Sequence, residues 1–137
     1  MKKKIAIIVA NYYPKISEML LEGLLQQLKK NNNIKNKIIF VPGIFEIPFA
    51  IAKNINRFDG FVALGCVIKG KTPHFGLISK SVINAIMDLS IKSKKPIGNG
   101  IITCLNKKQA YERADPNKKN KGGEAIKAVI WLFRTLG

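Results

Sequence analysis

The chain contains one histidine, and its surroundings suit proton transfer beside a phosphate group. His74 follows Lys71 and Thr72 in the segment KTPHF, shortly after an apolar run. An imidazole with a reference pKa near ~6.5 exchanges protons at neutral pH, and lysine and hydroxyl groups bind phosphate. A lone histidine is more often structural, but this position in a polar loop favours catalysis. We therefore predict that His74 is the acid–base group of a phosphate-binding site.

The loop before His74 fits a known phosphate-binding pattern. Residues 65–72 (GCVIKGKT) match G-x-x-x-x-G-K-[ST] and follow a predicted strand. Three observations argue against nucleotide hydrolysis: residues 66–68 look like continued strand, no later strand ends in an aspartate that would hold magnesium, and 137 residues are few for such an enzyme. Backbone amides and a lysine at a helix N-terminus still attract phosphate. The loop therefore stays a candidate phosphate site.

Four further residues have suitable chemistry for binding a polar substrate, and each has a plainer explanation. Glu46, in the apolar segment 41–48, either accepts hydrogen bonds from substrate hydroxyls or caps a helix N-terminus. Tyr12 is either a stacking platform or part of the core. Arg113 and Lys121 bracket a polar turn. They are either solvated charges or a phosphate clamp, for this site or for that of a neighbouring copy.

The charge balance points to an anionic partner. Lys and Arg number 24 against 8 Asp and Glu, which gives a formal charge of +16. No RNP, KH or zinc-finger pattern accompanies the lysine clusters, so a solvated surface is favoured and no nucleic-acid partner is predicted. Cys66 and Cys104 lie far apart without a CxxC motif, which excludes a structural zinc site. We predict two buried free thiols in a reducing cytoplasm.

Hydrophobic patterning predicts the elements that position these residues. Continuous apolar runs predict strands buried on both faces, and leucines and isoleucines at three- and four-residue spacing predict helices between them. The predicted strands are 5–9, 38–41, 61–64 and 97–103, and the predicted helices are 17–30, 47–55, 78–91, about 107–114 and about 121–136. The alternation predicts an α/β fold, with a parallel sheet between two helical layers, in one domain spanning 1–137.

The expected place of a site follows from this fold, because ligands bind such sheets beyond the carboxyl ends of the strands. The loops to consider are 10–16, 42–46, 65–74 and 104–106. The N-terminal MKKK followed by apolar residues imitates a signal peptide, but the apolar stretch is shorter than the ~7 to 15 residues of such a segment. No apolar run approaches the ~20 residues of a membrane span. We expect a soluble protein with no membrane partner.

Four segments of the chain, taken together, resemble one enzyme family. They are VPGIFEIP at 41–48, ALGCVIKGKTPHF at 63–75, QAYERA at 109–114 and NKGGE at 120–124. From end to end the chain is similar to the 6,7-dimethyl-8-ribityllumazine synthases of riboflavin biosynthesis. The resemblance implies a transferase-class condensation without cofactor or metal. In it, 5-amino-6-(D-ribitylamino)uracil and 3,4-dihydroxy-2-butanone 4-phosphate give 6,7-dimethyl-8-ribityllumazine, phosphate and water, the penultimate step of the pathway.

The resemblance also implies an architecture and an assembly. The family fold is a flavodoxin-like three-layer sandwich with a four-stranded parallel sheet, in agreement with the patterning. Its subunits form homopentamers whose active sites lie between neighbouring subunits. The resemblance leaves open whether pentamers stay single, pair as decamers or close into 60-subunit shells, and it suggests riboflavin synthase as a further partner.

Position by position, the resemblance implies a role for each candidate. His74 matches the proton-transfer residue. Eight positions match the ribitylaminouracil site. Tyr12 would stack on the pyrimidine, and Ile44, Phe45 and Glu46 would hold the ribityl chain. Cys66, Val67 and Ile68 would line the pocket mainly through backbone groups, and Asn99 also belongs to this set. The positions matching the butanone phosphate site are Lys71, Thr72, Arg113 from the neighbouring subunit, and Lys121 in support.

Some positions depart from the commoner family pattern. Asn99 stands where many members have an aromatic against the pyrimidine, which favours hydrogen bonding there over stacking. Lys71 replaces a small residue and would add charge near the phosphate. Two other classes of protein compete with the synthase. A P-loop nucleotide binder explains only residues 65–72, and a basic nucleic-acid module explains only the charge, whereas the synthase explains the loop together with His74 and Glu46.

Overall fold

The computed structural model describes residues 2–70 and 74–137. Its centre is a four-stranded parallel sheet in the order β2-β1-β3-β4. The strands are β1 (Lys3–Ala10), β2 (Ile34–Val41), β3 (Gly60–Ile68) and β4 (Ile97–Cys104). The parallel sheet predicted from the apolar runs is therefore confirmed, with strands longer at their ends than the runs themselves.

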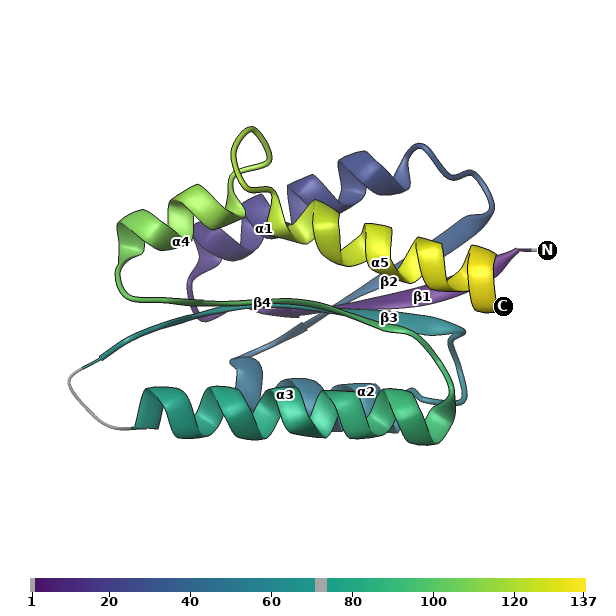
Figure 1. Cartoon of the computed structure of the whole chain (residues 1–137), viewed down its shortest axis with the longest axis horizontal. Helices are drawn as coiled ribbons and strands as arrows, with labels where there is room; N and C mark the ends of the chain where they lie inside the picture. Colours follow the sequence, from purple (N-terminus) through teal and green to yellow (C-terminus); the bar gives the residue numbers. More distant parts are fainter. Residues whose placement is uncertain (1, 71–73) are drawn as a thin grey trace.

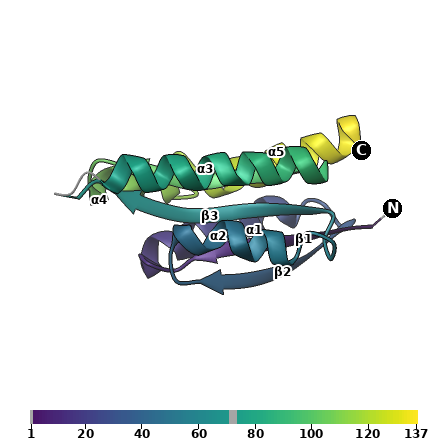
Figure 2. The same ribbon diagram turned by 90° about the horizontal axis from the view of Figure 1, so that it is seen from below.

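Helices cover both faces of the sheet (Figure 1). On one face lie α1 (Pro14–Leu28), α4 (Lys107–Ala114) and α5 (Lys121–Leu136), and on the other lie α2 (Ile47–Lys53) and α3 (His74–Ser93), with a short 3-10 turn, η1 (Ile44–Glu46), leading into α2. Figure 2 shows the molecule from below, with both termini at the amino end of the strands. In residues 2–70 and 74–137, no helix combines the length and apolar character needed to cross a membrane.

The core consists of two clusters, one on each side of the sheet. Alternate residues of β1 point to opposite faces, so that Ile5, Ile7 and Val9 pack beneath α1 and α5 while Ala6 and Ile8 pack toward α2 and α3. All of these side chains are fully buried. The central strands β1 and β3 are therefore buried on both faces, as their continuous apolar runs predict.

The edge strand β2 differs from that prediction. Between Ile34 and Val41 its burial ranges from partial to exposed, and Phe40 keeps 59% of its surface accessible. The strand pairs only with β1, and the seven-residue helix α2 is too short to cover its length. An apolar run reports the character of the side chains and not the number of elements that cover them, so the pattern overestimated the burial of this strand.

Two helix boundaries also differ from the predictions, and both matter for the site. The first helix begins at Pro14, not Ser17, because proline fits the first helical position where no amide partner is needed. The third begins at His74, not Ile78, which places the histidine in its first turn. The strand β3 continues through Ile68, as residues 66–68 suggested.

Candidate functional site

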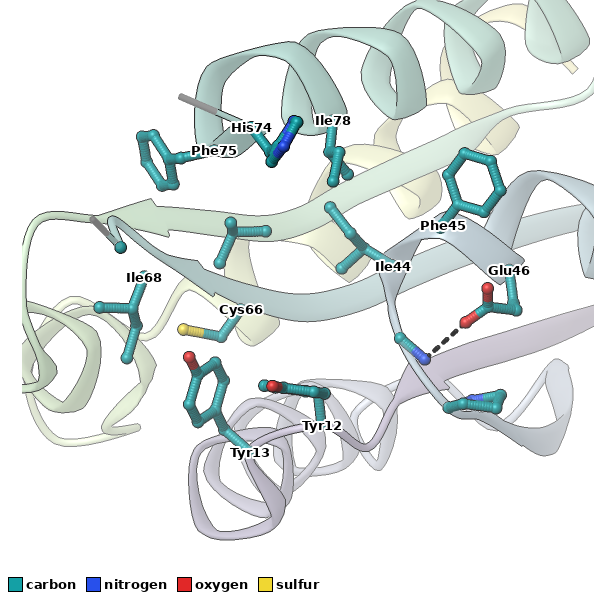
Figure 3. Close-up of a pocket in the computed structure, with 14 residues that line it drawn as sticks. Tyr12, Tyr13, Ile44, Phe45, Glu46, Cys66, Ile68, His74, Phe75 and Ile78 are labelled. Carbon is teal, nitrogen blue, oxygen red and sulfur yellow. Dashed lines mark hydrogen bonds between the residues drawn. The ribbon is translucent and has the colours of Figure 1, made fainter. Parts of the chain in front are cut away.

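A cavity of about 560 Å³ opens at the carboxyl ends of the strands. Three of the four loops expected to hold a site contribute to it, whereas the loop after β4 does not. Its lining residues are Tyr12, Tyr13, Pro42, Gly43, Ile44, Phe45, Glu46, Cys66, Val67, Ile68, Gly70, His74, Phe75 and Ile78 (Figure 3).

The cavity lies where the chain path leaves room for it. From β1 the chain runs through α1 on one face to β2, and from β2 it returns across β1 through α2 on the other face to β3. The connections thus diverge between β1 and β3, which is where α/β sheets commonly bind ligands. The end of β3 forms the floor, and the segments after β1 and β2 and the first turn of α3 surround it.

Aromatic rings give the cavity surfaces suited to a flat substrate. Tyr12 has 71% of its surface exposed and meets Tyr13 edge to face, with ring centroids 5.0 Å apart and planes at 81°. Phe45, from η1, is 70% exposed. Large aromatic surfaces left open beside a cavity are available for stacking. Figure 3 shows the two tyrosines on one side of the floor and His74 with Phe75 on the other.

Glu46 has the helix-end contact that the sequence offered as its plainer explanation. One carboxylate oxygen, Oε1, accepts a hydrogen bond of 2.9 Å from the Gly43 amide, and the Glu46 amide in turn donates to the Gly43 carbonyl at 3.2 Å. This pair fixes the turn that carries Ile44 and Phe45 into the cavity wall. The structural contact does not exclude a binding role, because a carboxylate accepts several hydrogen bonds.

His74 is exposed to solvent and lines the cavity from the first turn of α3. It is followed by Phe75 and, one helical turn later, by Ile78, so that the imidazole has apolar neighbours on the same wall. Lys71 and Thr72, which the sequence proposes for phosphate binding, lie outside the described residues. The cavity thus combines aromatic surfaces, one carboxylate and one imidazole.

Comparison with known proteins identifies the family. The model of the 6,7-dimethyl-8-ribityllumazine synthase family matches residues 2–136. The chain belongs to this family. The synthase of Bartonella tribocorum is 45% identical over 97% of the chain and 91% of that protein, and synthase 1 of Rhodopseudomonas palustris is 40% identical over 96% and 84%. The synthase of Zymomonas mobilis is 42% identical over 95% of the chain and 94% of its own length.

The thiol of Cys66, which lines the cavity, is unreactive at neutral pH. Burial, followed by the proximity of Cys104, raises the pKa of the Cys66 thiol to about 12. The thiol therefore stays protonated at neutral pH, and a protonated thiol is a poor nucleophile. Both cysteines are free and buried, as predicted. Burial likewise raises the pKa of Tyr13, with smaller contributions from Tyr12 and Cys66, so its hydroxyl remains a neutral hydrogen-bond donor.

Three residues that family resemblance assigns to the site do not line the cavity. Arg113, on α4, donates from Nη1 to the Thr103 carbonyl at 2.5 Å and lies 3.8 Å from the Cys104 sulfur. These contacts hold its guanidinium at the carboxyl end of β4. Lys121 forms an ion pair of 3.0 Å with Glu124 in the first turn of α5.

Asn99 lies on the edge strand β4, is exposed and does not line the cavity. Its Oδ1 accepts a hydrogen bond of 3.1 Å from the Ile101 amide, two residues further along the same strand. This contact occupies a backbone donor of an edge strand, which otherwise would be open to pairing with another chain. One amide side chain thus protects part of the sheet edge.

The structure also brings residues to the cavity that sequence reasoning missed. Tyr13, Phe75 and Ile78 all line it. The signal for Tyr13 was its place beside Tyr12 in the same loop. The signal for Ile78 was its four-residue spacing from His74, which puts both on one helix face once the helix begins at the histidine.

Proposed function

We propose that this cavity binds the two substrates of the lumazine synthase reaction and condenses them. The observation that carries the proposal is the meeting of open aromatic surfaces, Glu46 and His74 in one cavity of a chain that matches the family over 2–136. The products are 6,7-dimethyl-8-ribityllumazine, phosphate and water. The enzyme acts as one domain in the cytoplasm, in riboflavin biosynthesis.

The ribitylaminouracil occupies the part of the cavity between the tyrosines and the floor. Tyr12 stacks on the pyrimidine, and the backbone of Cys66, Val67 and Ile68 hydrogen-bonds its edge. Both roles suit the geometry, because the Tyr12 ring is open and the Cys66 thiol is neutral. The ribityl chain extends toward η1, where the free capacity of the Glu46 carboxylate accepts from its hydroxyls.

The butanone phosphate is held by cations from two subunits. Lys71 and Thr72 contribute from the loop before His74, and Arg113 contributes from a neighbouring subunit with Lys121 in support. Asn99 of that subunit faces the pyrimidine and not the phosphate. Support comes from the absence of these last three from the lining of their own cavity and from the exposed aromatic rings at its mouth. A neighbour that supplies the cations also covers the rings. These observations support a site shared between neighbouring subunits, and the resemblance to the family supplies their number, a homopentamer.

The reaction needs protons moved at each step. The substrate amine attacks the ketone carbon, and loss of water gives an imine. Removal of the proton on the adjacent carbon lets the carbon–oxygen bond to phosphate break, and phosphate leaves with the electron pair. The resulting enol tautomerises to a ketone, which the ribitylamino nitrogen attacks to close the ring with loss of a second water. His74 carries these protons, since it lines the cavity and an imidazole can both accept and donate a proton.

Much of the rate enhancement comes from holding two substrates in register. The attacking amine is already nucleophilic and phosphate is a good leaving group. Removing the proton carrier should therefore slow turnover moderately, whereas removing a phosphate contact should weaken binding.

The test is a steady-state assay that follows the lumazine chromophore and released phosphate. We expect His74→Ala to lower kcat by roughly 10- to 100-fold with little change in KM. Arg113→Ala should raise KM for the phosphate substrate and change kcat less. Lys30→Ala, an exposed charge change at the other end of the sheet, is the control and should match the wild type. No product from the wild type, or normal kinetics in both site variants, would contradict the proposal.

A further inference from the structure

Four cations gather around a second hollow, at the opposite end of the sheet from the lumazine synthase cavity. The hollow has a volume of about 530 Å³, and the side chains of Lys4, Lys35, Lys37 and Arg57 line it. We call it the basic hollow. It lies at the amino ends of β1 and β2, whereas the cavity lies at the carboxyl ends of the strands. The family reaction uses the cavity and leaves the basic hollow without a role.

The pairing of β1 with β2 explains why the three lysines converge. Lys4 is paired with Lys35, and Ala6 with Lys37, so all three lysines point to the same face of the sheet as Ala6. That is the face covered by α2 and α3. Because α2 has only seven residues, it leaves the start of β2 uncovered. The chain that follows α2 then brings Arg57 to the same place.

These charges repel one another and have no acidic partner in the described chain. Like charges directly opposite on neighbouring strands are destabilising, and Lys4 and Lys35 are such a pair. The ion pairs in residues 2–70 and 74–137 join Lys92 to Asp88 and Lys121 to Glu124, and none involves the four cations.

Asp59 is the acid next to these cations, and its carboxylate forms no ion pair with any of the four side chains. Asp59, beside Lys4, uses its carboxylate to accept from the Lys4 backbone amide at 2.8 Å. The Lys4 ammonium lies 5.7 Å from the Phe58 ring centroid, a contact that leaves its charge in place.

We propose that the basic hollow binds a small anion carrying two or more phosphate groups. Phosphate oxygens accept from several ammonium and guanidinium groups at once, and four cations around one bounded space match more charge than one phosphate monoester offers. Asn36 and Asn54 also line it, and the Asn54 side-chain amide donates to the Ala50 carbonyl at 2.8 Å. Phe58 is 8% exposed and lies beneath Lys4, so no aromatic face is free for a stacked base. The hollow therefore suits a compact polyphosphate better than a nucleic-acid strand.

Calorimetric titration of the full chain with inorganic tripolyphosphate tests the proposal. The double variant Lys35→Gln with Lys37→Gln removes two of the four charges from an exposed edge. A matched control, Lys118→Gln with Lys119→Gln, makes the same change in net charge in the exposed turn before α5. We expect saturable binding to the wild type, at least about tenfold weaker binding to the hollow variant, and a change within about twofold for the control. Orthophosphate should bind more weakly than tripolyphosphate.

Lumazine synthase activity of the hollow variant should equal that of the wild type, which also checks that the variant folds. Three results would overturn the proposal. The wild type fails to bind tripolyphosphate. The two double variants lose affinity equally, which would assign the binding to diffuse surface charge. A single-stranded RNA oligonucleotide binds while tripolyphosphate does not, which would make the surface a nucleic-acid track.

Discussion

The two helical layers of this lumazine synthase subunit differ in how completely they close. On the side of α1 and α5, glycines allow the helices to meet without intervening side chains: a Cβ at Gly122 would overlap the carbonyl oxygen of Leu20. Asn120 supports the contact from the left-handed region, with φ of 49°, and its side chain caps α5 through the Gly123 amide. Here helix packs directly on helix, although Trp131 and Leu136 on the outer side of α5 stay exposed.

The layer of α2 and α3 is open by comparison. Its large apolar side chains that remain exposed are Phe45, Phe49, Leu77, Ile78, Met87 and Ile91. An apolar surface of this kind is typical of a face that another chain covers. The same layer borders the cavity, whose aromatic rings are also open. The two layers therefore differ in their packing: the α1–α5 side has a close helix contact, and the α2–α3 side has more exposed apolar surface and borders the cavity.

A methyl group added to each layer should give opposite results. Gly122→Ala forces backbone apart at the contact of α1 with α5, so we expect the free energy of unfolding to fall by about 3 kcal/mol or more. Gly76→Ala, in the first turns of α3, meets no described atom within 4 Å and removes a flexible residue from a helix, so stability should rise by up to about 1 kcal/mol. Urea unfolding measures both. Equal effects would remove the distinction between the layers.

The fold of the closed side could be predicted from sequence because its signals are local. The leucine spacing between Leu20 and Leu28 predicts a helix, and the runs in β1 and β3 predict strands buried on both faces. The crossing at Gly122 could not be predicted, since a glycine pair in a sequence does not say which backbone approaches it. The exposure of β2 escaped prediction for a related reason: the coverage of an edge strand depends on the length of a helix elsewhere in the chain.

The site was predictable in its residue types and less so in its geometry. Apolar and polar residues at strand ends pointed to Tyr12, Glu46 and His74, and all three line the cavity. Tyr13 was missed because the sequence does not say where the ring next to Tyr12 points, which depends on the helix beginning directly after it at Pro14. The cavity to which Arg113 contributes depends on how copies of the chain assemble. The residue pattern of a single chain does not specify that arrangement.

Cys66 packs in the core on the side of α1 and α5 and also lines the cavity. Its raised pKa should make the free energy of unfolding decrease at alkaline pH. Its pKa is about 12 in the folded chain against a usual 9.0. Above about pH 9 the unfolded chain releases this proton while the folded chain keeps it, so stability present at neutral pH is lost as the pH rises toward 12. Urea unfolding from about pH 8 upward should show a steeper loss for the wild type than for Cys66→Ala. Parallel curves for the two proteins would rule out this contribution.

A smaller effect is expected in the turn that follows α3, in the open layer. Lys94 has φ of 59°, a left-handed conformation that costs a side-chain-bearing residue roughly 1 kcal/mol. Lys94→Gly should therefore raise the free energy of unfolding by up to about 1 kcal/mol. Lys92→Gly, two residues earlier and inside the helix, is the matched control and should lower it by a similar amount. If both variants shift thermal unfolding in the same direction, the turn is not strained.

The central claim is that one subunit's cavity is completed by a neighbour, and mixing two defective subunits tests it most directly. His74→Ala and Arg113→Ala chains are unfolded together, refolded as mixed oligomers, and assayed at a phosphate-substrate concentration where each variant alone has little activity. If His74 and Arg113 act in one site from different subunits, about one quarter of the sites in an equal mixture combine both native residues, and activity should recover to about that fraction of wild type. Activity that stays at the average of the two separate variants would contradict the account, because it would place both residues in a site made by a single subunit.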